Sequence, residues 1–368
     1  MANRLVTQVA SQNSDLAAIL ANMHLNPKNA IVEFKSATVV TVKGLNVMGF
    51  ALNGKWWVLD TDFDLDLDAD LDTGAKAHGT DYYVYLCDNA GSLVGLLSAA
   101  TTFPDGYDAD TSRKIGGFHY GRVRSVDANW IPQDSSNGSY GSGWEDDVST
   151  AILSNSVWDL KNRPTCTPEG MAKVGGIWVD IYLASVDDAI TLSTGKLLTG
   201  TTKSIYNANP LTGTESLNWY HFNELAKRTG KRMLSLAEWL QAAEGSPEGN
   251  DDDNADAWSD TDNTARNPTG TVANAVSAYN ICDCVGNVYE WLDEWLHDPT
   301  ATTGAYYDPM TGEGVGQLYM YSATGLHAII AGGYWSFGVI AGSRCVSVNN
   351  YPWVVHTFRG CRFACDSL

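Results

Sequence analysis

Residues 332–366 have the sequence GGYWSFGVIAGSRCVSVNNYPWVVHTFRGCRFACD, and this stretch decides how the whole chain is interpreted. In an extended backbone, alternate side chains point to opposite faces. One face would then be uniformly apolar, formed by Trp335, Phe337, Val339 and Ala341. The other would be chemically mixed, formed by Tyr334, Ser336, Gly338 and Ile340, and the pattern recurs at Val354, His356 and Phe358. A mixed face beside a regular one indicates a surface that is free of packing constraints and able to bind a ligand.

Composition narrows the class of protein. The chain has 368 residues, of which 44% are hydrophobic and 18% charged, so we expect two or three domains with packed cores. The formal net charge of −20 argues against nucleic-acid binding, which needs clustered Lys and Arg. No segment approaches the ~20 apolar residues of a membrane helix, and the N-terminal residues lack the apolar core of a secretory signal. We therefore expect no membrane insertion, and synthesis in the cytoplasm without a signal peptide.

Local patterns divide the chain into three regions and predict an α+β fold. Residues 1–35 form an N-terminal segment, with a short helix expected at 14–23 and a possible role in assembly. Residues 36–155 are rich in β-branched and aromatic residues, which indicates a sandwich-like β domain ending in a polar loop at 125–146. Residues 156–368 form a mixed domain. Helical spacing begins at residue 221 and stops at Gly230, and Ser235 with Glu238 forms the capping box of a second helix.

Two further patterns leave metal binding open. The aspartates within residues 251–262 are suited to Ca²⁺, although an acidic run is more often simply solvated. The chain has seven cysteines, an odd number, so at least one has no partner within the chain. Cys282 and Cys284 with Cys361 and Cys365 could supply a Zn²⁺ site, but neither spacing is the usual one and buried free thiols are favoured. We expect no metal and no other cofactor.

Five motifs in a fixed order carry a family resemblance. They are KRMLSLAEWLQAA (231–243), CVGNVYEWLDEW (284–295), GGYW (332–335), GSRC (342–345) and GCRFACD (360–366). This order resembles the formylglycine-generating-enzyme branch of the C-type lectin fold. Three more segments, DYYVYLCD (81–88), SRKIGGFHY (112–120) and VWDLKNRPTCTPEGM (157–171), resemble the phage tropism determinants, which are receptor-binding variable proteins encoded beside diversity-generating retroelements. The resemblance spans residues 37–366 and implies a C-terminal C-type lectin fold preceded by a β-rich domain.

The resemblance also separates binding from catalysis. The enzyme branch oxidises its substrate with a pair of cysteines just after the GGS strand, and here residues 335–340 hold no cysteine. Because only a thiolate can perform that step, we expect that the protein is not an enzyme. An enzyme of this superfamily with altered chemistry is one alternative. A sugar-binding lectin is another, although no Glu-Pro-Asn-type sugar motif is present.

The binding interpretation assigns a set of variable residues. The diversified positions of the tropism determinants transfer without a gap to Tyr334, Ser336, Gly338, Ile340, Ser347, Asn349, Asn350, Val354, His356, Phe358 and Arg359. All eleven are residue types that adenine mutagenesis of AAC or AAT codons can produce. The residues between them would be a fixed scaffold, including Trp335, Gly342, Ser343, Arg344, Trp353, Gly360, Phe363 and Cys365. We expect side chains of the first set to be mostly exposed, and Trp335, Phe337 and Phe363 to be buried.

The same resemblance implies partners and a location. The expected partner is a host cell-surface receptor, itself a protein. The protein would lie on a virion, at the tail-fibre tip, or on a cell surface. It is expected to be a homo-oligomer, with a trimer favoured because the tropism determinants trimerise.

Overall fold

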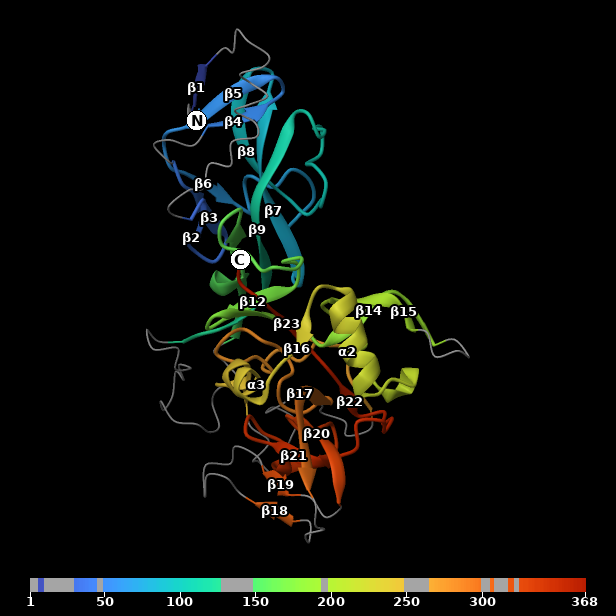
Figure 1. Ribbon diagram of the computed structural model, residues 1–368. Helices are drawn as coiled ribbons and strands as arrows, with labels where there is room; N and C mark the ends of the chain where they lie inside the picture. The colour runs from blue at the N-terminus through green and yellow to red at the C-terminus, as the bar shows by residue number, and fades with distance from the viewer. Residues whose placement is uncertain are drawn as a thin grey trace. The chain divides into compact units, whose positions relative to one another are not determined.

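The computed structural model describes residues 6–9, 30–44, 49–126, 148–192, 198–247, 265–298, 305–307, 317–320 and 324–368. The helix expected at 14–23, the acidic run 251–262 and most of the loop 125–146 lie outside these residues. The chain forms two compact units (Figure 1). The first comprises residues 1–121, 150–163 and 368, and the second residues 122–149 and 164–367. The three-region division predicted above stays a prediction. No helix among the described residues is long and apolar enough to cross a membrane.

The first unit is built from antiparallel sheets, as its β-branched and aromatic composition predicted. One sheet has the order β1(Val6–Val9)-β5(Lys55–Leu59)-β4(Gly49–Leu52), and a second has β2(Val32–Phe34)-β3(Val39–Val42)-β6(Phe63–Asp66). The third has the order β10(Val148–Ile152)-β9(Ser112–Arg124)-β7(Thr80–Asn89)-β8(Ser92–Ser98), and β11(Trp158–Asp159) pairs with β9. All three DYYVYLCD, SRKIGGFHY and VWDLKNRP segments of the resemblance therefore contribute strands to one sheet.

A single apolar core joins these sheets. Trp57, Phe63, Tyr82 and Phe118 are among its members, and each is at least nine-tenths buried. A buried carboxylate fixes the entry of the chain into this core, because Asp159 accepts a hydrogen bond from the backbone N–H of Val32 at 3.2 Å. The core residues described in this unit all belong to the first unit itself.

The described residues of the second unit form three sheets and two α-helices. A four-stranded sheet has the order β12(Met171–Val174)-β13(Ile177–Asp180)-β23(Phe363–Asp366)-β16(Arg232–Met233). A hairpin is formed by β14(Ala184–Leu192) and β15(Leu198–Ser204). The largest sheet has the order β18(Ala305–Tyr307)-β19(Leu318–Met320)-β21(Val346–Asn350)-β20(Gly325–Ala331)-β17(Tyr289–Asp298)-β22(Arg359–Gly360). The C-terminal segment, orange to red in Figure 1, contributes strands to two of these sheets.

Both helices follow the local signals in the sequence. Helix α2(Trp219–Arg228) ends at a Gly230 with φ of +71°, whose N–H bonds to the carbonyl of Lys227. Helix α3(Leu236–Ala243) has the predicted capping box, in which Ser235 and Glu238 bond to each other's backbone N–H. The apolar side of α2 packs against β15 and β16, and α3 packs against β17 and β20. The α+β class is confirmed.

The strands expected at both ends of the variable region are wrong. Residues 334–337 form a turn, and Gly338–Ile340 is a 3-10 helix, η4. Residues 352–358 form turns without strand pairing. The glycines explain the first departure, since Gly332, Gly333 and Gly338 all have positive φ, a conformation incompatible with a regular strand. Residue types do alternate along this segment, but the backbone is not an extended strand, so the alternation does not place them on two opposite faces.

Candidate functional site

A buried ion pair joins the GNVYEW motif to the GCRF motif near the end of the chain. The Arg362 guanidinium forms two hydrogen bonds to the Glu290 carboxylate, at 2.6 and 2.9 Å, and both side chains are fully buried. Arg362 also donates to the backbone carbonyl of Cys282 at 2.8 Å. Burial raises the pKa of Glu290, and the charge of Arg362 opposes that effect. The GNVYEW and GCRF motifs thus meet through their charged residues, which gives a physical reason for both.

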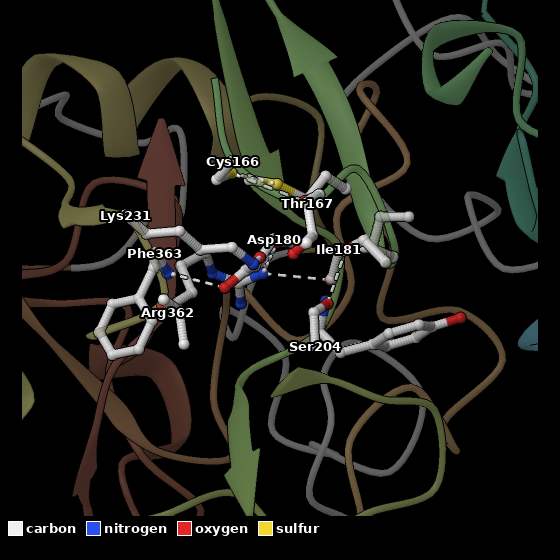
Figure 2. Close-up of polar contacts among 12 residues, drawn as sticks. Cys166, Thr167, Asp180, Ile181, Ser204, Lys231, Arg362 and Phe363 are labelled. Carbon is white, nitrogen blue, oxygen red and sulfur yellow. Dashed lines mark hydrogen bonds and ion pairs between the residues drawn. The ribbon is translucent and has the colours of Figure 1, made fainter. Parts of the chain in front are cut away.

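A second buried pair, formed by Lys231 and Asp180, lies beside Arg362 of the first pair (Figure 2). The Lys231 ammonium contacts the Asp180 carboxylate at 2.5 Å, and Asp180 also accepts from the backbone N–H of Phe363 at 3.3 Å. Burial raises the pKa of Asp180, and the Lys231 charge opposes it. Lys231 directly follows the glycine that ends α2, so the helix terminus places this cation in the core. The two pairs hold the end of β13 next to the start of β23, and this fixes the position of the last strand of the chain.

Two glycines turn the chain out of β20 toward the surface. A Cβ at Gly332 would lie 2.3 Å from the carbonyl oxygen of Cys284, and a Cβ at Gly333 would lie 2.5 Å from the Cβ of Ala341. Both have φ near +90°, which side-chain-bearing residues rarely adopt. The GGYW motif therefore combines a left-handed turn with close backbone packing, and it delivers Tyr334 and Trp335 to the edge of the core.

Aromatic rings form a continuous group at this edge, which we call the aromatic face. Tyr334 stacks on Phe358 at 4.4 Å, and Phe358 stacks on His356 at 4.7 Å. Phe337 meets Tyr334 at 4.3 Å. Beneath them, the buried Tyr289 contacts both Tyr334 and Phe337, at 5.8 and 5.3 Å. Residues more than twenty positions apart are thus brought into one stack whose base is fixed and whose top reaches solvent.

Eight of the eleven predicted variable residues are at least partly accessible. Ser336 and His356 are exposed, and six more are half-buried: Tyr334, Gly338, Ile340, Asn349, Val354 and Phe358. Ser347, Asn350 and Arg359 are buried, which corrects the expectation for those three. Phe363 is buried as expected, at 1% exposure, whereas Trp335 and Phe337 are only half-buried because the expected strand is a turn.

The buried members have identifiable surroundings. Asn350 donates from its side-chain amide to the hydroxyl of Ser347 at 3.0 Å, so these two satisfy each other on β21. Tyr319 of β19 lies opposite Ser347, and its ring contacts Tyr306 at 4.6 Å. Tyr306 in turn contacts Phe337 at 6.3 Å. The β21 residues therefore adjoin the aromatic face through rings that the sequence interpretation did not select.

Arg359 is an unusual member of the set. Its side chain is only 8% exposed, and its Nε and Nη1 atoms are buried without a hydrogen-bond partner. Its guanidinium lies over the rings of Trp291 and Phe358, at 5.1 and 5.5 Å, which offers cation–π stabilisation only. Burial lowers the pKa of Arg359 to about 10. The candidate surface thus contains a cation with two buried nitrogens that have no hydrogen-bond partner.

The sequence interpretation missed several exposed apolar residues beside the predicted set. Trp353, placed in the scaffold, is 54% exposed and stacks on Tyr351 at 5.0 Å. Val355 is also exposed. The segment carrying them is fixed from below, because the carbonyl of Pro352 accepts from the N–H of Trp219 at 3.1 Å and that of His356 accepts from Gly213 at 2.9 Å. The sequence did offer one signal for this exposed residue, because Trp353 is a large apolar residue that lies between two predicted variable positions.

Thiols and acidic residues offer little chemistry at this face. Cys345 is buried with its sulfur 3.5 Å from the Tyr289 hydroxyl, and Cys361 is buried beneath the sheet. Burial raises the pKa of Cys361, and likewise that of Cys282, so their thiolates are disfavoured. Among the residues described here, no three His, Cys, Asp or Glu side chains gather as a metal site. The arrangement presents rings, an amide, hydroxyl groups and one cation, which suits non-covalent recognition.

Comparison with known families matches both halves of the chain. Residues 28–145 match a family model described as "Mtd second domain". Residues 179–367 match the "Sulfatase-modifying factor enzyme 1-like domain". The second match contains the two buried ion pairs and the aromatic face.

Comparison with individual proteins covers almost the entire chain. It is 30% identical over 358 residues to the "Tail fiber receptor-binding protein" of Bordetella phage BPP-1, which covers 92% of this chain and 81% of that protein. Among solved structures, the "Major Tropism Determinant M1 Variant" matches with a TM-score of 0.66 at 22% identity. The "Major Tropism Determinant P3c Variant" matches with a TM-score of 0.65 at 23% identity. Each covers 97% of this chain and 88% of the other, so the fold is shared throughout.

Proposed function

The chain belongs to the family of phage tail-fibre receptor-binding proteins that includes the tropism determinants, and we propose that it binds a host cell-surface receptor through the aromatic face and its neighbours. The contact residues in this proposal are the eight accessible variable residues, together with Trp353 and Val355. Ser347, Asn350 and Arg359 support the surface from below. The receptor is a protein, since rings, amides and hydroxyl groups are the groups with which paratopes contact proteins.

One observation carries the proposal: accessible side chains of mixed chemistry lie on a backbone held by buried residues. Tyr334 and Phe358 are partly accessible, the buried Tyr289 contacts Tyr334, and the ion pair of Arg362 with Glu290 is fully buried. Side chains above such a frame can change without altering the fold, which is the requirement for a surface that is diversified. Tyr and Phe also lose little conformational entropy on binding, because each has two side-chain torsions.

A catalytic function is less well supported, although the C-terminal family model is named for an enzyme. Cys345 contacts Tyr289 in the interior, and the turn 334–340 contains no thiol. We therefore assign binding rather than catalysis to this domain. The protein acts on the virion as part of a tail fibre, and as a homotrimer.

The experiment is a binding screen against isolated host surface proteins. It compares the parent protein with a Tyr334→Ala/Phe358→Ala variant and with a Cys345→Ala variant, each checked for folding by circular dichroism. We expect the aromatic variant to lose binding or change its preference, with a loss of at least tenfold in affinity. The Cys345→Ala variant should keep the ligand of the parent. A folded aromatic variant with unchanged binding, or loss only in Cys345→Ala, would overturn the proposal.

A further inference from the structure

Two cysteines far apart in the sequence of the second unit lie next to each other. Pro164 pairs with Ser367 in an antiparallel bridge, and the N–H of Thr165 donates to the carbonyl of Asp366 at 2.9 Å. Cys166 and Cys365 are the next residues along these two segments. Cys166 lies just after the start of the stretch 164–367 of the second unit, and Cys365 lies in its last strand, β23.

The two side chains are in direct contact. The thiol of Cys166 and the backbone N–H of Cys166 both donate hydrogen bonds to the sulfur of Cys365. A disulfide spans Cα atoms roughly 4.4–6.8 Å apart, which is a spacing that residues on adjacent paired segments commonly have. The bridge between Pro164 and Ser367 and this contact together place the two thiols where a disulfide can form.

The surroundings favour reaction between these two thiols over the other five. Cys166 is half-buried, whereas the remaining cysteines are all buried. Hydrogen bonds from the thiol of Cys166, and then from its backbone N–H and from Thr165, lower the pKa of Cys365 to about 7, against the effect of burial. The charge of Lys231 also lowers the pKa of Cys365. Cys365 can thus ionise near neutral pH, whereas its hydrogen bond with Cys166 and burial raise the pKa of the solvent-reachable Cys166 above the usual value.

We propose that Cys166 and Cys365 form an intramolecular disulfide once the folded protein meets a low-molecular-weight disulfide outside the reducing cytoplasm. The Cys365 thiolate accepts the proton of the more accessible Cys166, and the Cys166 thiolate so formed attacks the external disulfide and releases one equivalent of reduced thiol. Cys365 then loses that proton to solvent, and its thiolate attacks the sulfur of Cys166 and releases the second equivalent. The protein loses two electrons and two protons, and the external disulfide gains them.

This bond would tie the C-terminal end of the variable region to the start of the domain. It closes a loop of about 200 residues, and long loops give the largest restriction of the unfolded chain. The strand that follows the variable residues would then be fixed by a covalent bond in addition to its pairing with β13 and β16. The proposal does not depend on the identity of the receptor, because it concerns only the scaffold.

The test is oxidation of the folded full-length protein with oxidised glutathione, followed by peptide mapping without reduction. We expect one internal cross-link joining the peptides of Cys166 and Cys365, loss of two free thiols, and a melting temperature about 5 °C or more above that of the reduced protein. A Cys166→Ser variant should show no cross-link and no thermal shift. A Cys87→Ala variant, altered in the other unit, should behave as the parent does.

Several outcomes would overturn the proposal. One is glutathione that remains attached to Cys166 without an internal cross-link. Another is a cross-link between other cysteines, and a third is a thermal shift that persists in Cys166→Ser. Unreactive thiols in the folded parent, with cross-linking only after denaturation, would show that the register does not bring the sulfur atoms together.

Discussion

Arg359 shows at the scale of one residue how a binding surface can reduce stability. Its guanidinium is buried between two rings, and two of its nitrogens have no acceptor. An uncompensated buried charge costs free energy, whereas an apolar side chain of similar volume fills the same space without that cost. The contact with Trp291 offsets only part of the penalty.

We therefore expect Arg359→Met to raise the free energy of unfolding by about 1 kcal/mol, the scale of one unsatisfied buried polar group. Urea denaturation of the two proteins measures this difference. Arg359→Lys is the matched control, because it keeps a cation at the site and should give no gain. A loss of more than about 1 kcal/mol in Arg359→Met would mean that the guanidinium contributes net stabilisation, contrary to its lack of partners.

The segment 332–366 contains buried and exposed residues, and substitution should reduce the free energy of unfolding much more at the buried ones. Phe363 is 1% exposed and lies in the core with Tyr289 and Trp291, so Phe363→Ala should cost about 3–5 kcal/mol. Ser336 is exposed, and Ser336→Ala should change stability by less than about 0.5 kcal/mol. Thermal melts of both variants test this difference, and similar losses at the two positions would contradict it.

At the scale of elements, the aromatic face is supported by a short helix whose capping carboxylate makes stability depend on pH. The 3-10 helix η3(Gly213–Glu215) binds the carbonyl of His356 through the N–H of Gly213. Glu215 holds this element by accepting from Arg266 at 2.6 and 2.9 Å and from the N–H of Thr212 at 2.8 Å. Burial acts to raise the pKa of Glu215, but these bonds outweigh it and leave the pKa below its usual value.

A lowered carboxyl pKa stabilises the fold above the unfolded value, near 4.5, and that contribution is lost as the pH falls through the folded value. We therefore expect the unfolding free energy to fall between about pH 5 and pH 3, and this fall to be smaller in Glu215→Gln. Urea titrations at several pH values measure the slope. Glu224→Gln, on the surface of α2, serves as the control. An unchanged slope in Glu215→Gln would show that this carboxylate does not contribute to acid sensitivity.

The elements that sequence predicted well are those fixed by local chemistry. The capping box of Ser235 and Glu238 and the stop at Gly230 need only neighbouring residues, and both are confirmed. The expected strand at 334–341 failed because the positive φ of Gly333 depends on close packing against Ala341, a contact not visible in a run of letters. Trp353 and the burial of Arg359 were missed for the same reason, since exposure is set by distant segments such as Trp219 and Trp291.

At the scale of the whole molecule, we expect one copy of the proposed surface to bind its receptor only weakly. The aromatic face offers two principal anchors, Tyr334 and Phe358, and both are half-buried. Only part of each ring is therefore available to a partner, which favours a weak single contact. Several linked copies would raise the effective affinity by ~10²–10⁴ if they can engage at once.

We therefore expect a homotrimer, assembled through residues outside the segment 332–359, that leaves every aromatic face free. Light scattering should give a mass near three times the 39.8 kDa of one chain. Binding to a densely coated receptor surface should be at least ~10²-fold tighter than binding to a sparse one, because only the dense surface allows simultaneous contacts. Tyr334→Ala/Phe358→Ala is the control for assembly and should keep the oligomeric mass while losing binding at both densities. A monomer at working concentration would contradict the trimer, and a trimer whose affinity is independent of receptor density would contradict the use of avidity.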